Sequence, residues 1–347
     1  MMTEVAATDR EQPFSRMLPL PPSRGPITAS LFAALVEEVG SPIATDFDFH
    51  VDDVLTDDDL QLALYVCYEL HYAELKGVDA RWEWAPSLLA FRAMLESRFE
   101  AAISSLVRPC SPAESADVGG SLQQIVEADA GPSLSRYVET WASHEQFLES
   151  VIHRSAYQLK EADPHSWAIP RLTGAPKAAL VEVQSDEYGG GSVDRMHSVL
   201  FANTMAALGL DASYGHYLAQ LPGITLATVN LMSFFGLHRR LRGALVGHLA
   251  AFEMTSSVPN RRYANGLRRL GYGSPATDFY DEHVEADAVH ENIAAWDLAH
   301  GLARAEPWLA ADILRGARAL LAVDGLWARH LMTAWQREEA SLRQSRR

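Results

Sequence analysis

The sequence predicts an all-α protein. From Thr28 onward, almost every segment repeats its apolar residues with the 3.6-residue period of an amphipathic helix, as at 31–39 and 60–75. Alternation of apolar and polar residues, which is typical of strands, is scarce. Proline and glycine also punctuate the periodic segments: Pro259 and Pro307 stand at predicted helix starts.

The helices can be placed in order along the chain. One is expected to begin near Thr56, because Thr56 and Asp59 have the spacing of a capping box. A long helix over 134–162 should end before Pro164, since proline disfavours helix in the residue before it. The remaining helices are expected near residues 122–130, 174–188, 193–208, 212–220, 225–256, 258–269, 276–304 and 306–341.

Composition shifts divide the chain into three parts. Residues 1–27 contain five prolines and no helical period, which predicts a flexible leader. Pro, Gly and Ser are frequent over 108–121, so this stretch is interpreted as a linker or long loop. The predicted domains are therefore an N-terminal helical region at 28–121, which could serve as a dimerisation arm, and a catalytic domain at 122–347.

Length and charge exclude several classes of protein. With 347 residues the chain is long enough for about two domains. Its 29 Lys and Arg against 45 Asp and Glu leave a formal charge of −16, which repels phosphate, so no nucleic-acid partner is expected. The longest apolar stretch, 224–237, is too short to span a bilayer, so no membrane partner is expected either.

Cysteine content and the N-terminus indicate the compartment. Cys67 and Cys110 are the two cysteines, too few for a disulfide framework or a cysteine-based zinc or iron–sulfur site. The acidic N-terminus lacks the basic and then apolar layout of a signal peptide. Both features favour a cytoplasmic protein.

One predicted helix carries a stripe of metal-binding residue types. His283, Asp287 and His290 stand at i, i+4 and i+7, which places three donors on one narrow face. Taken alone, this match is more often an accident of ordinary polar neighbours on an acidic helix. Further ligands are needed to decide between the two interpretations.

Three more acids stand in suggestive places. Glu253 follows a mostly apolar helix, where a buried carboxylate would be costly without a partner cation. Glu187 and His197 flank three consecutive glycines, which would let the chain bend so that both side chains reach one point. Glu161 closes the long helix before Pro164, although simple polar surface explains it equally well.

The negative charges of the candidate acids indicate bound metal ions. The four candidate acids carry four negative charges: Glu161, Glu187, Glu253 and Asp287. If they converge, their mutual repulsion would drive proton uptake unless cations share the site. Two ferrous ions would balance these charges. Imidazole and carboxylate ligands without thiolate suit iron or manganese with open positions for dioxygen, whereas structural zinc normally uses cysteine.

The complete pattern carries a family resemblance. Its members, in order, are Glu161, Glu187, His197, Glu253, His283, Asp287 and His290. With the spacing Glu-x9-His, then Glu, then His-x3-Asp-x2-His, the chain resembles the heme-oxygenase-like diiron oxidases, also described as iron-containing redox enzymes. The resemblance covers roughly residues 140–340. It implies a heme-oxygenase-like helical bundle in which these seven side chains hold two iron ions. The Glu-x-x-His motif of ferritin-like diiron bundles does not occur in the sequence.

The resemblance also implies an activity. We expect an oxidase or oxygenase that uses dioxygen as co-substrate on a small organic molecule, with N-oxygenation of an amine or amino-acid derivative as the leading reaction. Alternatives are oxidative C–C cleavage or desaturation of an amino or fatty acid, and a non-catalytic metal-binding helical protein. The expected partners are the small-molecule substrate, an external electron donor and a second copy of the chain in a homodimer.

Residues around the seven candidates have expected roles as well. Metal-bound imidazoles usually donate their free N–H to a carboxylate or carbonyl, for which the candidates are Asp186, Gln184, Asp194 and Glu291. One of Arg239, Arg240 and Arg242 could bind a substrate carboxylate, although surface ion pairs are the commoner fate of such residues. The remaining histidines are excluded from the ligand set, and His248 is interpreted as structural.

Overall fold

The structure, a computed structural model, describes residues 17–47 and 53–344 and, within 285–289, the backbone alone. It is all-α, as predicted; in the part described, the strands are β1 (Met17–Leu18) and β2 (Glu74–Leu75), which pair in parallel. The α-helices are α1 (Pro26–Leu35), α2 (Asp58–Glu69), α3 (Pro86–Leu106), α4 (Pro112–Ala116), α5 (Val118–Glu127), α6 (Leu134–Thr140), α7 (His144–Gln158), α8 (Asp163–Ser166), α9 (Gly174–Glu187), α10 (His197–Ala207), α11 (Gly223–Leu237), α12 (Arg242–Met254), α13 (Ser257–Arg269), α14 (Asp278–Asn292), α15 (Gly301–Ala305) and α16 (Ala310–Gln336).

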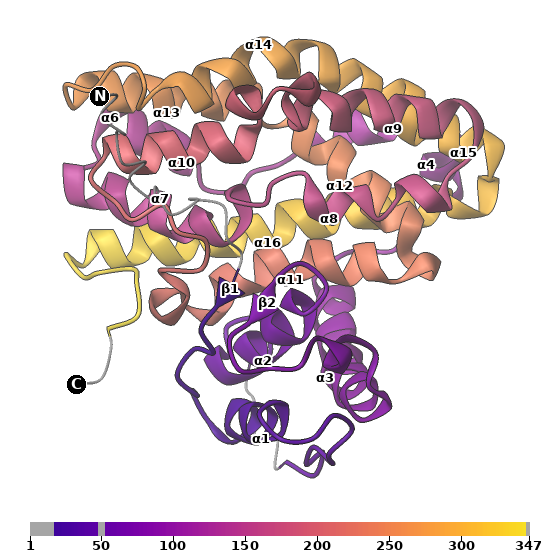
Figure 1. Cartoon of the computed structure of the whole chain (residues 1–347). Helices are drawn as coiled ribbons and strands as arrows, with labels where there is room; N and C mark the ends of the chain where they lie inside the picture. The colour runs from indigo at the N-terminus through magenta and orange to yellow at the C-terminus, as the bar shows by residue number, and fades with distance from the viewer. Residues whose placement is uncertain (1–16, 48–52, 345–347) are drawn as a thin grey trace, which may run out of the picture.

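The helices are arranged in layers (Figure 1). At one end of the molecule lie α1, α2 and α3, and α2 packs against α11. The next layer contains α11 and α16, and α12 packs along α16. On the far side, α13 and α14 pack against each other, and α14 also contacts α12. Within the described ranges, none of the helices combines the length and apolar character needed to cross a membrane.

Two glycines let α12 and α16 approach closely. A Cβ atom added at Gly247 would overlap the carbonyl oxygen of Ile313, and one added at Gly316 would overlap that of Ala244. Such contacts require backbones without side chains between them. This close pair positions the C-terminal end of α12, where Glu253 lies.

The start of α2 differs from the prediction. Asp57, not Thr56, is the N-cap, and its side chain accepts a hydrogen bond from the backbone N–H of Leu60 at 2.6 Å. The Asp59 carboxylate instead accepts from the backbone N–H groups of Ile27 and Thr28, at 2.8 and 2.9 Å. Asp59 therefore satisfies the free donors at the start of α1, a tertiary role that local spacing does not reveal.

Two predicted long helices are each interrupted. The helix expected over 134–162 is divided at 141–143, where Ser143 and Gln146 form a capping box that starts α7. The helix expected over 225–256 is divided after Leu237, because His238 adopts an extended conformation. In both cases the flanking helices bury apolar faces, so the period continues across the break.

Two further expectations need correction. The segment 212–220 contains only a 3-10 turn, Leu218–Gln220. The predicted loop at 108–121 instead contains α4 and the start of α5, which are capped by Ser111 and Asp117. Because α5 spans residue 121 and packs against α16, the chain is helical where a linker was expected.

Two features fix the segments that carry the predicted ligands. Lys160, the neighbour of Glu161, is fully buried and forms an ion pair with Glu69 of α2, which also accepts from the Tyr214 hydroxyl at 2.7 Å. This ion pair ties the N-terminal helices to the segment after α7. Following His290, α14 continues into a π-helical segment, Ile293–His300, that packs against α9 and α12.

The close α12–α16 contact can be tested within one helix. Gly316→Ala should lower the free energy of unfolding by about 1–3 kcal/mol, because the added methyl group overlaps the α12 backbone. Gly325→Ala, also in α16, meets only the Arg329 guanidinium, at 3.6 Å, and should be neutral or stabilise by up to about 1 kcal/mol. Urea unfolding measures both. Equal stabilities of the two variants would contradict the packing described.

Candidate metal centre

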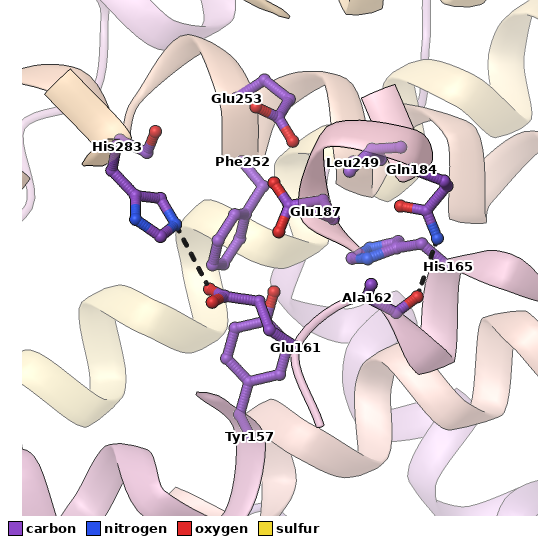
Figure 2. A pocket seen from close by; sticks show the side chains of 11 residues that line it. Tyr157, Glu161, Ala162, His165, Gln184, Glu187, Leu249, Phe252, Glu253 and His283 are labelled. Atoms are coloured by element: carbon purple, nitrogen blue, oxygen red, sulfur yellow. Dashed lines mark hydrogen bonds and ion pairs between the residues drawn. The ribbon is translucent and has the colours of Figure 1, made fainter. Parts of the chain in front are cut away.

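The predicted ligands come from the ends and faces of several helices. Glu161 follows α7, Glu187 is the last residue of α9, His197 is the first of α10, Glu253 lies near the end of α12, and His283 and His290 lie on α14. Figure 2 shows Glu161, Glu187, Glu253 and His283 directed towards a common space. The structure therefore brings together side chains that are up to 129 positions apart, from Glu161 to His290.

The donor atoms fall into two groups that share one residue. In the first group, Glu161, Glu187, His197 and His283 each offer a nitrogen or oxygen within 4.8 Å of the others. In the second group, Glu187, Glu253 and His290 do the same. All six side chains are buried. A carboxylate has two oxygens, so Glu187 is placed to serve both groups.

Asp287 is the seventh predicted ligand. Its side chain lies outside the described residues, so its part in the site stays a prediction. Its position between His283 and His290 on the helical backbone of α14 is the one expected from the sequence.

Distances between imidazole and carboxylate atoms suit a shared cation. His197 Nδ1 lies 2.9 Å from Glu187 Oε2, His283 Nε2 lies 3.7 Å from Glu161 Oε1, and His290 Nδ1 lies 3.6 Å from Glu253 Oε2. Two ligand atoms that are each about 2.1 Å from one ion stand roughly 3 Å apart. These pairs are therefore near the separation that a bound ion would require.

The hydrogen bonds of two histidines determine which nitrogen faces the centre. His283 Nδ1 donates to the carbonyl oxygen of Phe279 at 2.8 Å, which leaves Nε2 facing Glu161. His290 Nε2 donates to Asp186 Oδ2 at 2.9 Å, which leaves Nδ1 facing Glu253. Such partners orient metal-binding imidazoles and select their tautomer.

The four residues predicted to accept hydrogen bonds from the imidazoles differ in what they contact. The hydrogen bond from His290 to Asp186 confirms one of them, and the Asp186 side chain is 60% exposed. Gln184 donates instead to the Ala162 carbonyl oxygen and to Ser166 Oγ, both at 2.8 Å. Asp194 and Glu291 are exposed at the surface.

Burial controls the protonation of the centre. Burial raises the pKa of Glu161, which the charge of Glu187 raises further while His283 lowers it. The pKa of Glu253 is raised for the same reasons, with His290 acting in the opposite direction. Burial disfavours a charged His290, but hydrogen bonds to Glu253 and Asp186 outweigh it and raise its pKa to about 9. Without a metal ion, the centre therefore retains protons that a cation would displace.

The glycine turn before His197 acts as the sequence predicted. Gly189, Gly190 and Gly191 all have positive φ angles, of 68°, 59° and 86°. A Cβ atom on Gly189 would lie 2.6 Å from the backbone nitrogen of Met196, so the turn also needs a close backbone approach. This tight turn places His197 beside Glu187.

A small enclosed cavity adjoins the donor groups, with Tyr157, Leu249 and Phe252 in its wall (Figure 2). His165 also lines it and lies 3.1 Å from His248, nitrogen to nitrogen. Burial lowers the pKa of His165 to about 3, so this part of the wall is uncharged. Among the described residues, His165 belongs to neither donor group. The sequence patterns did not lead us to expect His165 in the cavity wall. The feature that could have indicated it is its position four residues after Glu161, which is the spacing of one helical turn.

The cluster fits a bound cation. Glu161 Oε2 is buried and has no hydrogen-bond partner among the described residues, a costly state for a carboxylate oxygen. The ion pairs observed for Glu161 and Glu253 are with imidazoles rather than with lysine or arginine. Nitrogen and oxygen donors without thiolate suit iron and leave positions open for a further ligand.

Fold and site together define an all-α protein with a buried carboxylate–imidazole centre suited to iron. The chain belongs to the iron-containing redox enzymes, a family with a heme-oxygenase-like helical fold; the family's model matches residues 148–325, just over half of the chain. That range includes every donor residue described above. The protein is accordingly an oxidoreductase.

A more specific similarity covers a smaller part of the chain. Over 137 residues it is 30% identical to a nitrosourea synthase of Streptomyces achromogenes subsp. streptozoticus. The match covers 39% of this chain and 29% of that relative's length.

The arginines predicted to bind a substrate carboxylate form ion pairs elsewhere. Arg240 pairs with Glu100 at 2.7 Å, and Arg242 pairs with Glu306. Among the described residues that line the cavity beside the donors, Arg239, Arg240 and Arg242 are all absent. Surface ion pairing, the commoner fate of such residues, is therefore observed for Arg240, whereas Arg242 is buried where it pairs with Glu306.

The electrostatic cost of the centre can be measured on the metal-free protein. Glu161→Gln should raise its melting temperature by a few degrees at neutral pH, because it removes a buried carboxylate. A pKa that is raised in the folded state means that the native protein binds more protons, so stability falls as the pH rises above the unfolded value of about 4.3. The gain from Gln should therefore increase as the pH is raised from that unfolded value towards neutrality.

Calorimetry over this pH range measures the effect. Glu282→Gln on α14 is the matched control, because that carboxylate is partly exposed and pairs with the exposed Arg195. It should give no comparable gain. A metal-free Glu161→Gln variant that is less stable than the unsubstituted protein at every pH would refute the argument.

Proposed function

We propose that the protein is a non-heme diiron enzyme that uses dioxygen to oxidise a small organic substrate, with N-oxygenation of an amine or amino-acid derivative as its reaction. The observation that carries this proposal is the pair of donor groups that share Glu187. A single ion would leave one of the two groups without a cation. Two ions, one held by each group, would use both, with Glu187 available as a ligand in each group.

Charge balance supports two ions as well. Glu161, Glu187 and Glu253 bring three negative charges into a buried space, and Asp287 is the predicted fourth. Two ferrous ions carry four positive charges and leave the histidines neutral. Ferrous iron bound to carboxylates and imidazoles, with open positions, can activate dioxygen.

The protein's own residues prepare the site for this chemistry. Hydrogen bonds from His283 to Phe279 and from His290 to Asp186 hold the imidazoles in the tautomers that present a lone pair. Tyr157, Leu249 and Phe252 place apolar surface beside the donors, which would limit the contact of an oxidising centre with water on that side.

The choice of N-oxygenation draws on the partial match to a nitrosourea synthase. A nitrosourea contains an oxidised nitrogen, so that relative's name denotes nitrogen chemistry. The homodimer, the external electron donor and the cytoplasmic location stay predictions from the sequence.

Iron content tests the two-ion arrangement. Anaerobic loading with ferrous iron should give about two ions per chain, as in other diiron carboxylate sites. Glu253→Ala or His290→Ala should reduce this to about one, because each removes a ligand from the second group only. Glu187→Ala should reduce it below about one, since it affects both groups. Asp287→Asn tests the predicted seventh ligand and should lower the iron content below about two ions per chain.

The control for these variants is His216→Ala, which replaces a histidine that is 47% exposed and outside both groups. It should retain full iron, and circular dichroism should show the same helicity for all variants. A Glu187→Ala protein that still binds two ions would exclude Glu187 as a ligand shared by the two groups.

Product analysis tests the reaction. Iron-loaded protein supplied with candidate amines, a reductant and heavy-oxygen-labelled dioxygen should yield a product with labelled oxygen on nitrogen. Unlabelled alkene product would favour desaturation, and a shortened carbon skeleton would favour C–C cleavage. Iron binding without oxygen uptake for any candidate would favour a non-catalytic metal-binding protein.

A further inference from the structure

A second and larger cavity, of about 340 Å³, adjoins the candidate metal centre. It shares Glu161, Phe252, Ser256 and His283 with the small enclosed cavity beside the donors. Its other end reaches the surface, where the exposed Asp129 and Ser133 line it. This volume is at the small end of the range for ligand pockets, which suits a small molecule rather than a peptide or long lipid.

One face of α7 and the turn after it line this cavity as far as the metal centre. Arg154, Gln158 and Glu161 all line it, at spacings i, i+4 and i+7. Arg154 and Gln158 are one helical turn apart, about 6 Å along α7, and Glu161 follows in the turn after the helix. The cavity thus combines a cationic position, an amide and a predicted iron ligand in one row.

Arg154 is held in a fixed orientation. Its Nη1 and Nη2 atoms donate to the Asp324 carboxylate at 3.5 and 3.2 Å, and its guanidinium carbon lies 3.9 Å from the centre of the Trp327 ring. A guanidinium has five N–H donors, so it can bind a second carboxylate while it keeps the first. Arg262 also lines the cavity; it donates to Ser133 Oγ and Ser135 Oγ and lies 3.8 Å from Glu139, so, like Arg154, it would bind a substrate carboxylate beside one that it already contacts.

Gln158 offers an acceptor between this cationic position and the metal centre. Its Oε1 atom is buried and has no hydrogen-bond partner within the part of the chain that the structure describes. A buried acceptor without a partner is costly, and an N–H group of a ligand would satisfy it. More than half of the residues lining the cavity have polar side chains, which a fatty acyl chain would leave without partners.

We propose that this cavity is the substrate pocket and that it selects small nitrogen compounds that also carry a carboxylate. Arg154, supported by Arg262, binds the carboxylate. Gln158 Oε1 accepts from the substrate N–H, which places the nitrogen towards Glu161 and His283. This inference rests on the proposed function and assigns recognition to residues outside the donor groups.

Binding measurements on the full chain test the pocket without turnover. The probes are ε-aminocaproate, which has both groups, hexylamine, which lacks the carboxylate, and hexanoate, which lacks the nitrogen. Calorimetric titration under anaerobic conditions, with and without ferrous iron, should show ε-aminocaproate binding about tenfold more tightly than either of the others. Equal affinities for the three probes, or no binding of ε-aminocaproate, would overturn the proposal.

Substitutions assign the recognition to individual residues. Arg154→Lys keeps the positive charge but loses the paired N–H donors of the guanidinium, and Arg262→Gln loses the charge. Each substitution should lower the affinity for ε-aminocaproate about tenfold and leave the affinity for hexylamine unchanged. In Gln158→Met the new side chain has a similar shape but no amide. This variant should bind ε-aminocaproate and hexylamine more weakly and hexanoate with unchanged affinity. Arg240→Gln is the matched control, because that arginine pairs with Glu100 away from the cavity, and it should bind all probes normally.

The outcomes separate this inference from the proposed function. If the chain fails to bind two iron ions but keeps the ranking of probes and its dependence on Arg154 and Gln158, the diiron proposal fails and the pocket stands. If iron binds as expected while the variants bind every probe normally, the pocket assignment is wrong. Should Arg154→Lys fail to fold, Arg262→Gln and Gln158→Met still decide the question.

Discussion

The structure depends on one unfavourable arrangement, the burial of several carboxylates within a few ångströms of one another. Glu161, Glu187 and Glu253 are all buried, and the charge of Glu187 raises the pKa of the other two. Apolar packing elsewhere must offset the free energy that burial of these carboxylates costs. The close contact of α12 with α16 is one source of such stabilisation. A divalent cation turns the same repulsion into binding energy, which is why the site and the fold cannot be considered separately.

Much of the site could be predicted from the sequence because its signals are local. His283 and His290 lie on one helical face, and Gly189 to Gly191 bend the chain between Glu187 and His197 as expected. The breaks within the predicted long helices could not be predicted in the same way. Apolar periodicity continues across a break when both flanking helices face one core, so a short irregular segment such as 141–143 leaves little trace in the pattern.

Residues whose role is tertiary were also beyond prediction. Asp59 satisfies the start of α1, a helix more than twenty positions earlier, instead of its own helix. Arg154 and Gln158 have ordinary positions on an amphipathic helix, and only the packing of Trp327, Asp324 and Arg262 around them forms a cavity. The arginine cluster at 239–242 was the more conspicuous feature in the sequence, but Arg240 and Arg242 are bound in ion pairs with Glu100 and Glu306.

The hydrogen bond between His290 and Asp186 connects the interior with the solvent. One end of this imidazole faces the buried donors, while the other contacts a carboxylate that is 60% exposed. A proton that leaves the His290 ring can therefore pass to bulk water through a single acceptor, without crossing the apolar layers around it. The proposed substrate cavity lies along α7, whereas Asp186 lies on α9, so the solvent contact of His290 and the opening of that cavity are formed by different helices.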